Sequence, residues 1–223
     1  MIGHLWYSVV HHLLRFIFGV FCRMEVVGAE NLENIKGACI IAGNHTCYYD
    51  PPLFGAVSRR RVNCIAQSTL FKVPVLRLIM KSLGAISVDR ANPEAGTIKL
   101  AVEKLKNGEI LGIFPEGRRV MNEEEEGKSS EKGVSLIAKM SGAPVVPFSI
   151  IGAKECITFH HKFIPRFKKV KVVVGEPMTY VRKKDREEEK ANMKEFADEL
   201  MRRIIAPVLE ERDRNAENGR KDS

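Results

Sequence analysis

The sequence predicts a single α/β domain with a mostly parallel central sheet flanked by helices, preceded by an N-terminal amphipathic helix. Three observations support this fold class. Short apolar runs alternate with segments of helical periodicity between residues 24 and 211. No internal repeat or interdomain linker interrupts this alternation. With 223 residues and 44% hydrophobic content, the chain is long enough to bury the core of one domain.

Seven apolar runs predict the strands, at residues 24–28, 38–43, 62–67, 85–88, 109–114, 144–150 and 169–175. Between them, apolar residues at helical spacing predict helices over 98–105 and from residue 134 onwards. A continuous apolar stripe from Met193 to Val208 predicts a C-terminal helix, in which Pro207 should kink or weaken the last turn. Residues 212–223 show no periodicity, and we expect them to form a disordered tail.

Residues 1–23 predict an amphipathic helix. Ser8, His11, His12 and Arg15 fall on one narrow stripe, and apolar residues cover the remaining surface. A spanning helix needs roughly 20 mostly apolar residues, and Arg15 near its centre would cost about 3 kcal/mol. We therefore expect the helix to lie in a membrane interface, with Arg15 and the histidines toward lipid phosphates. The alternative is a helix that packs only on the domain's own core.

The composition favours an anionic partner. There are 36 basic against 28 acidic residues, which gives a formal net charge of +8 and suits nucleic acid, a phospholipid surface or a phosphorylated substrate. We expect no nucleic acid, because the strands carry no aromatic residues interleaved with basic ones. The five cysteines form no C-x-x-C pair, so we expect neither a disulfide framework nor a zinc site, and a cytosol-facing location.

The segment "NHTCYYD" begins where a buried strand ends, at the edge where open α/β sheets place ligands. The Asp-Pro step predicts that Asp50 caps a helix that starts at Pro51. Because two successive prolines lack amide donors, the cap has mainly the amide of Leu53 to satisfy. One carboxylate oxygen then remains for the ring N–H of His45. Such a pair is a base and its orienting partner, and we expect the substrate to supply the nucleophilic hydroxyl.

Cys47 is the competing nucleophile, because a Cys and His pair supports a covalent thioester intermediate. It lies only two residues from His45, and only the start of the following helix would lower its pKa. We favour the interpretation of Cys47 as a small filler.

Two further clusters follow predicted strands. In "IFPEGRRV", Pro and Gly form a tight turn around Glu116, the amide of Gly117 can point outward, and Arg118 and Arg119 bring donors suited to phosphate. In "GAISVDR", a strand ends at an Asp-Arg pair that includes Arg90. Each cluster alone also fits a surface turn or ion pair. Because the strands are predicted to be parallel, all three clusters should meet on one rim of the sheet.

These segments together resemble the glycerolipid acyltransferases, which include the 1-acylglycerol-3-phosphate acyltransferases. "NHTCYYD" resembles the H-x4-D motif of that family, and "GAISVDR", "FPEGRR" and "VVPFSI" resemble its second, third and fourth blocks in the same order. The resemblance covers roughly residues 24–180 of the chain. The family usually has serine at the position of Cys47 and threonine at that of Arg118, and the latter difference leaves the headgroup preference open.

The resemblance implies a role for each matching residue. His45 would be the general base on the acceptor hydroxyl and Asp50 its orienting partner. The acceptor's phosphate and glycerol would be bound by Arg90, Glu116, Gly117, Arg118 and Arg119. Residues 145–150, with Pro147, would shape the sheet edge beside the acyl groove. Neither a metal nor a bound cofactor is required.

The implied reaction is acyl transfer from acyl-CoA or acyl carrier protein to the sn-2 hydroxyl of lysophosphatidic acid, which forms phosphatidic acid. A peripheral or monotopic protein on the cytoplasmic face of the cell membrane would meet these substrates. Alternatives are an acyltransferase for glycerol-3-phosphate or another lysophospholipid, and a non-catalytic module that binds anionic membranes. The basic runs at 59–61 and 160–169 would contact headgroups, form solvated loops or hold the phosphopantetheine part of the donor.

Overall fold

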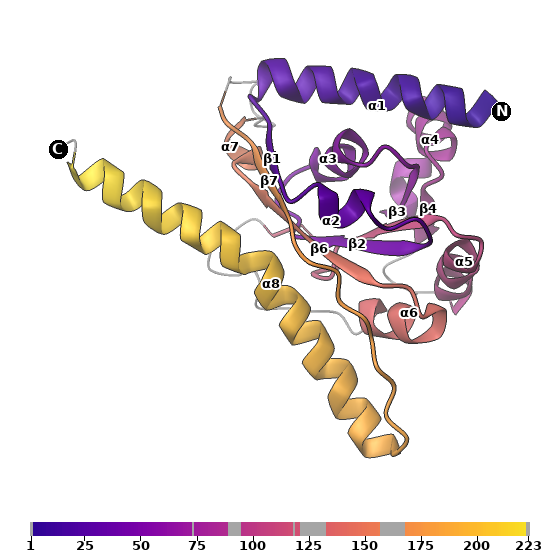
Figure 1. Cartoon of the computed structure of the whole chain (residues 1–223). Helices are drawn as coiled ribbons and strands as arrows, with labels where there is room; N and C mark the ends of the chain where they lie inside the picture. Colours follow the sequence, from indigo (N-terminus) through magenta and orange to yellow (C-terminus); the bar gives the residue numbers. More distant parts are fainter. Residues whose placement is uncertain are drawn as a thin grey trace.

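The fold was obtained as a computed structural model that describes residues 2–72, 74–88, 95–117, 119–120, 133–156 and 168–221. A twisted sheet forms its centre, and helices lie on both faces (Figure 1). The strands are β1 (Glu25–Val27), β2 (Cys39–Gly43), β3 (Val62–Gln67), β4 (Ile86–Val88), β5 (Ile110–Ile113), β6 (Val145–Ile151) and β7 (Lys171–Val174). The helices are α1 (Ile2–Phe21), α2 (Glu30–Glu33), α3 (Asp50–Val57), α4 (Pro74–Ser82), α5 (Ala95–Lys106), α6 (Gly133–Ser141), α7 (Ala153–Cys156) and α8 (Arg186–Lys221), with a 3-10 turn, η1 (Ser68–Lys72).

All seven predicted strands are present and form one sheet in the order β1-β7-β6-β2-β5-β3-β4. Strand β2 pairs in parallel with both β5 and β6, and β3 pairs in parallel with β5 and β4. Only β6 and β7 pair antiparallel. The predicted mostly parallel α/β class is therefore confirmed. The strands β2, β4 and β5 all end on the same rim, because they run in the same direction.

Two apolar clusters form the core, one on each face of the sheet. Successive side chains of β2 point to opposite faces, so Cys39 and Ile41 belong to the cluster under α1 and α3, whereas Ile40 and Ala42 belong to the cluster under α5, α6 and α8. All four are fully buried. A strand that is buried on both faces reads as a continuous apolar run, which explains why "ACIIAG" lacks polar alternation.

Helix α1 packs on α3 through one face. Its buried residues include Tyr7, His11 and Phe18, and Nδ1 of His11 lies 2.8 Å from the carbonyl oxygen of Gly55. The prediction that the histidines face lipid phosphates is therefore wrong for His11, because α3 offers that ring a buried hydrogen-bond acceptor. The outward face of α1 is largely apolar and includes Phe16, which is 63% exposed. Among the described residues, no helix has an apolar stretch long enough to cross a bilayer.

Helix α8 extends further than the sequence predicts. It continues through Pro207 to Lys221, where we expected a weakened turn and then a tail without regular structure. Close to the proline, the Ser149 hydroxyl on β6 donates a 2.6 Å hydrogen bond to the carbonyl of Ile204, so the sheet holds the helix next to the residue that interrupts its hydrogen-bond pattern. Beyond this point Glu211 pairs with Arg214 one turn later, and helix-favouring residues continue the helix without an apolar stripe.

Candidate active site

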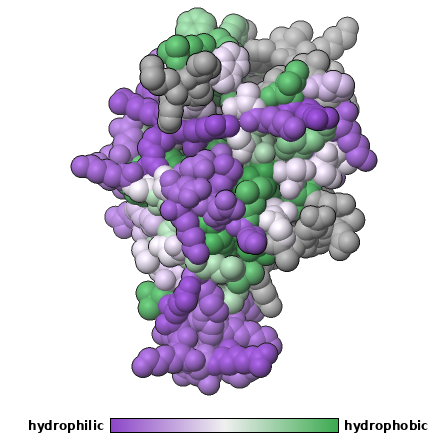
Figure 2. Space-filling model, turned by 90° about the vertical axis from the view of Figure 1, so that its right-hand side faces the viewer, coloured by the Kyte–Doolittle hydropathy of each residue, from purple (hydrophilic) through white to green (hydrophobic). Residues whose placement is uncertain are grey.

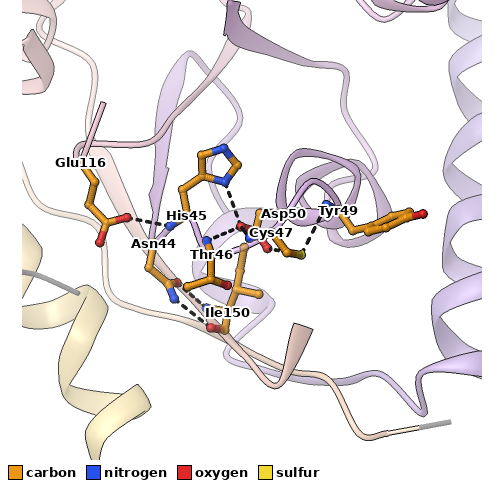
Figure 3. Close-up of polar contacts among 8 residues, drawn as sticks. All are labelled: Asn44, His45, Thr46, Cys47, Tyr49, Asp50, Glu116 and Ile150. Carbon is orange, nitrogen blue, oxygen red and sulfur yellow. Dashed lines mark hydrogen bonds and ion pairs between the residues drawn. The ribbon is translucent and has the colours of Figure 1, made fainter. Parts of the chain in front are cut away.

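His45 and Asp50 lie together directly after β2. Nδ1 of His45 is 2.9 Å from Oδ2 of Asp50, and Figure 3 shows the second ring nitrogen pointing away from the carboxylate. Asp50 is fully buried, and the His45 side chain is 11% exposed. A carboxylate that is ionised can only accept hydrogen bonds, so Nδ1 carries the hydrogen and Nε2 presents its lone pair. The fold thus brings the predicted base and its orienting partner into contact.

The Asp50 carboxylate stabilises the loop that carries His45, and does not cap α3. Its Oδ2 also accepts hydrogen bonds from the backbone amides of Thr46, at 2.7 Å, and Cys47, at 2.8 Å. Asp50 is the first residue of α3, and the amide of Leu53 bonds to the carbonyl of Tyr49. The predicted cap on Leu53 is therefore wrong, because the loop amides lie closer to the carboxylate. These hydrogen bonds from the backbone amides fix the carboxylate that holds the His45 ring.

The His45 ring is fixed from a second side by aromatic stacking. Phe114, at the end of β5, lies against it with ring centroids 4.2 Å apart and planes 21° apart. Phe54 of α3 stacks on Phe114 at 4.9 Å and meets Phe148 of β6 edge to face at 4.8 Å. The sequence analysis missed Phe114, although its position next to "PEGRR" on the predicted rim was a usable signal. The stacked ring of Phe114 and the hydrogen-bonded carboxylate of Asp50 together restrict rotation of the His45 imidazole.

Glu116 joins the turn after β5 to the His45 loop. Its Oε2 accepts a 2.8 Å hydrogen bond from the backbone amide of His45 (Figure 3). The amide of Val120 donates to the His45 carbonyl at 2.7 Å. Glu116 is only 3% exposed. The predicted meeting of two motifs on one rim is thus observed. One oxygen of Glu116, a residue that the resemblance assigns to binding of the acyl acceptor, positions the loop that carries His45.

The other residues of this turn fall into two groups. The amide of Gly117 bonds to the carbonyl of Phe114 at 3.0 Å, so it closes the turn and does not point outward as expected; the positive φ of 67° explains the glycine. Arg119 packs over the ring of Tyr48, 3.5 Å from its centroid, and bonds to its hydroxyl at 2.8 Å. Arg119 is therefore held beside the His45 loop by a residue that the sequence analysis did not single out.

Two of the predicted acceptor-binding residues, Arg90 and Arg118, lie outside the described residues, as does most of the basic run at 160–169. The run at 59–61 has structural roles. Arg60 donates to the carbonyls of Ile35 and Gly37, and Arg61 to that of Ser82. These guanidinium groups bond to backbone carbonyls, so the run is not simply a patch of free cations.

Asn44 fastens the start of the site to the neighbouring strand. Its side-chain amide donates to the carbonyl of Ile150 at 2.9 Å, and its oxygen accepts from the amide of Ile150 at 2.7 Å (Figure 3). Asn44 is fully buried. A polar residue at the end of a buried strand requires such partners, which is the signal that could have revealed it from the sequence.

Cys47 does not have the properties of a nucleophile. It is 7% exposed, and its thiol donates to Oδ1 of Asp50 at 3.1 Å. Burial, and secondarily the charge of Asp50, raise the pKa of Cys47, so the thiol stays protonated at neutral pH. This supports the interpretation of Cys47 as a filler that bonds to the carboxylate. In the described part of the chain, no hydroxyl or thiol bonds to the His45 ring.

The segment predicted to shape a sheet edge, residues 145–150, forms an internal strand instead. β6 lies between β7 and β2, and Pro147 pairs with Ala42. The sequence pattern predicts β7 as a strand but does not predict which strand it pairs with. In the structure β7 pairs antiparallel with β6 and covers the side of β6 that we expected to be a sheet edge. Only the end of β6 reaches the rim.

An imidazole held by a buried carboxylate thus lies at the rim of a parallel sheet where α/β proteins commonly bind their ligands. Within the described residues, no group of three or more histidine, cysteine or carboxylate side chains is arranged to hold a metal ion.

Comparison with known proteins identifies the family. The sequence model of the family described as Acyltransferase matches residues 23–151. The chain is 30% identical over 173 residues to the 1-acyl-sn-glycerol-3-phosphate acyltransferase of Bacillus subtilis, which covers 77% of this chain and 82% of that protein. It is 26% identical over 163 residues to the chloroplastic 1-acyl-sn-glycerol-3-phosphate acyltransferase BAT2 of Brassica napus, which covers 71% of this chain and 46% of that protein. The chain belongs to the acyltransferase family.

A solved structure shares the fold. The 1-acyl-sn-glycerophosphate (LPA) acyltransferase PlsC from Thermotoga maritima superposes with a TM-score of 0.67, over 90% of this chain and 80% of that one, at 24% sequence identity. The superposition extends well beyond the residues that the family model matches.

Proposed function

We propose that this protein transfers an acyl group from a thioester, acyl-CoA or acyl carrier protein, to the sn-2 hydroxyl of a 1-acylglycerol-3-phosphate. The observation that carries the proposal is the 2.9 Å contact between His45 and Asp50, which leaves Nε2 of the ring ready to accept a proton. The names of the relatives from Bacillus subtilis and Brassica napus support the choice of acceptor.

The reaction follows from these groups. Nε2 of His45 removes the proton from the acceptor hydroxyl as its oxygen attacks the thioester carbonyl, and a tetrahedral oxyanion forms. The Asp50 carboxylate stabilises the positive charge on the ring. When the intermediate collapses, the C–S bond breaks and the leaving sulfur takes the proton from His45, which returns the base to its starting form. Thioester and hydroxyl must be held together at the ring, and this positioning supplies much of the rate gain.

The test is turnover by the purified protein. Incubation with acyl-CoA and lysophosphatidic acid should release thiol and form phosphatidic acid, and His45→Ala should lower kcat by roughly 10²- to 10⁴-fold. Glycerol-3-phosphate and other lysophospholipids, offered in competition, show whether the acceptor is assigned correctly. Equal turnover by wild type and His45→Ala would refute the proposed mechanism.

We further propose that the outer face of α1 binds the cytoplasmic surface of the cell membrane, where the acceptor resides. Six apolar side chains of α1 are each about half or more exposed: Leu5, Trp6, Val9, Leu13, Phe16 and Val20. At helical spacing they share one side of the helix. Helix α1 runs along the top of the molecule in Figure 1, and Figure 2 shows hydrophobic residues there, whereas hydrophilic residues surround the start of α8 at the bottom. An outward apolar face rimmed by Arg15 and His12 has the composition of an interfacial helix.

Sedimentation with vesicles that contain anionic lipid tests this surface. The double variant Leu13→Asp with Phe16→Asp should lose most of its vesicle binding, because it places two charges in the apolar face. Ser8→Asp, which adds a charge on the exposed polar side of the same helix, serves as the control. It should retain more vesicle binding than the double variant. Undiminished binding by the double variant would exclude α1 as the binding surface.

A further inference from the structure

A cavity of about 300 Å³ adjoins the His45 loop on the side of β6. It lies between the end of β6, helix α7, the residues before β7 and the last third of α8. We call it the α8 cavity, because residues 208–215 of that helix form one wall. This wall lies in and next to the segment that the sequence predicted to be disordered, and outside the residues that the family model matches.

The α8 cavity shares a wall with the active site. Thr46, which lines it, is the residue after His45 and donates its amide to Asp50. Val120, which also lines it, donates its amide to the carbonyl of His45. A ligand in the cavity therefore lies against the backbone of the loop that holds the base.

The cavity combines apolar walls with a basic rim. Ile150, Val120 and Val208 contribute apolar surface. Among the described residues, four basic side chains line it against two acidic ones: Lys154, Lys168, Lys169 and Arg212 against Glu155 and Glu211. This mixture suits an extended, partly apolar chain that ends in an anionic group.

Ion pairs within the protein involve both an acidic and a basic residue of the rim. Glu211 accepts a 2.9 Å hydrogen bond from Lys171 and forms an ion pair with Arg214 at 3.1 Å. The hydrogen bond from Lys171 is the main reason why the pKa of Glu211 is lowered. Its negative charge is thus compensated by groups outside the cavity lining. Lys169 pairs with Glu25, whereas exposed Lys168 makes no ion pair in the described part of the chain.

The cavity lies on the β6 side of the His45 loop, and among the described residues it meets the turn assigned to the acceptor only at Val120. β2, which carries His45, lies between β5 and β6. The turn with Glu116 and Arg119 follows β5, and the α8 cavity lies at the end of β6. A direct transfer needs both substrates at the ring at once, so two sites that flank the His45 loop match an acceptor on one side and a donor on the other.

We propose that the α8 cavity binds the phosphopantetheine arm of the acyl donor, with the phosphate of the arm among Lys154, Lys168 and Arg212. This assignment rests on the proposed acyl transfer. The arm is a thin chain of methylene and amide groups that ends in phosphate, which matches apolar walls and a basic rim. A volume of about 300 Å³ is at the small end of the range for ligand sites, which suits a thin chain of this kind.

The experiment compares donors that differ in the phosphate. Acyl-CoA and acyl-4′-phosphopantetheine carry it, and acyl-pantetheine lacks it. In the double variant Lys154→Glu with Lys168→Glu, KM should rise about tenfold for the two phosphate-bearing donors, which corresponds to about 1.4 kcal/mol. KM for acyl-pantetheine, KM for the acceptor and kcat should change less than about twofold, since phosphate contacts alone are altered. An acyl carrier protein donor should respond as acyl-CoA does, because both carry the same arm.

The matched control is Lys184→Glu with Lys190→Glu, which makes the same charge change at exposed positions around the start of α8. It should leave KM for every donor unchanged. An unchanged KM for acyl-CoA in the cavity variant would overturn the assignment. The assignment would also be overturned if KM of the cavity variant rose for acyl-CoA but not for acyl-phosphopantetheine. An equal rise in KM for acyl-pantetheine would overturn it as well.

Calorimetric titration of the protein with free CoA separates this inference from the proposed function. If the wild type shows no acyl transfer but binds CoA about tenfold more tightly than the cavity variant, the proposed function fails and the cavity assignment stands. If acyl transfer occurs and the cavity variant binds CoA as tightly as the wild type, the assignment fails and the function stands.

Discussion

Oδ2 of Asp50 accepts the ring N–H of His45 and, at the same time, the backbone amides of the two residues that follow it. One oxygen thus fixes both the base and the loop from which it projects. The two functions of this carboxylate, charge and loop geometry, can be separated by substitution.

Asp50→Asn should retain the loop but lose most of the activity. The asparagine oxygen can still accept from the amides of Thr46 and Cys47, so the melting temperature should change little, whereas the missing charge should lower kcat by roughly 10²- to 10⁴-fold. Asp50→Ala also removes the acceptor of these amides and should lower the free energy of unfolding by about 3 kcal/mol. Kinetics and urea denaturation of both variants check this. An active Asp50→Asn enzyme would show that orientation alone suffices.

Cys47→Ser should remain active. The thiol is buried, donates to Asp50, and has a raised pKa because of burial and the nearby charge. A serine hydroxyl can donate the same hydrogen bond, so kcat should stay within about threefold of wild type. The pH dependence of its activity between pH 6 and 9 should match that of the wild type, because the wild-type thiol stays protonated over this range. Accumulation of an acyl group on Cys47 in the wild type, detected by mass spectrometry, would instead support covalent catalysis.

Loss of the stacking of Arg119 on Tyr48 should raise KM for the acyl acceptor and leave KM for the acyl donor unchanged. Tyr48→Phe removes only the hydroxyl contact, whereas Tyr48→Leu removes the ring as well. A cation–π contact at an exposed site is worth about 0.5–1 kcal/mol, so KM for lysophosphatidic acid should rise about three- to fivefold in Tyr48→Leu and less in Tyr48→Phe. Monoacylglycerol, which lacks the phosphate, is the control acceptor. If its KM rises equally, Arg119 does not bind the phosphate.

Alkaline pH should destabilise the fold. Burial raises the pKa of Cys39 from 9.0 to about 11 and that of Cys22 to about 12. Because the thiols release their protons at lower pH in the unfolded chain, the stability is complete below pH 9 and falls as the pH rises toward these values, by about 1 kcal/mol per pH unit for each thiol.

Urea unfolding at pH 7.5 and pH 10 measures this fall. Cys39→Ala should show a smaller decrease between the two pH values than wild type, even though it starts from a lower stability. An identical decrease in both proteins would mean that other groups cause the alkaline loss.

Much of the fold and part of the site could be predicted from the sequence. The apolar runs specify all seven strands, and the strand-end motifs place His45, Asp50 and Glu116 on one rim, because parallel strands end on the same side. Hydrophobic periodicity and turn residues determine local structure over a few positions, so both can be recognised from the sequence alone. The contact between His45 and Asp50 belongs to this group, since the two residues are only five positions apart.

Only the tertiary structure decided which partner each polar group takes. Glu116 bonds to an amide 71 residues away, and Asn44 to a strand 106 residues away. His11 finds its acceptor on α3. The last turns of α8 become one wall of a cavity although they have no apolar stripe. A polar side chain bonds to whichever group packing brings within about 3 Å, and that proximity depends on the order of the strands, which local sequence patterns do not contain.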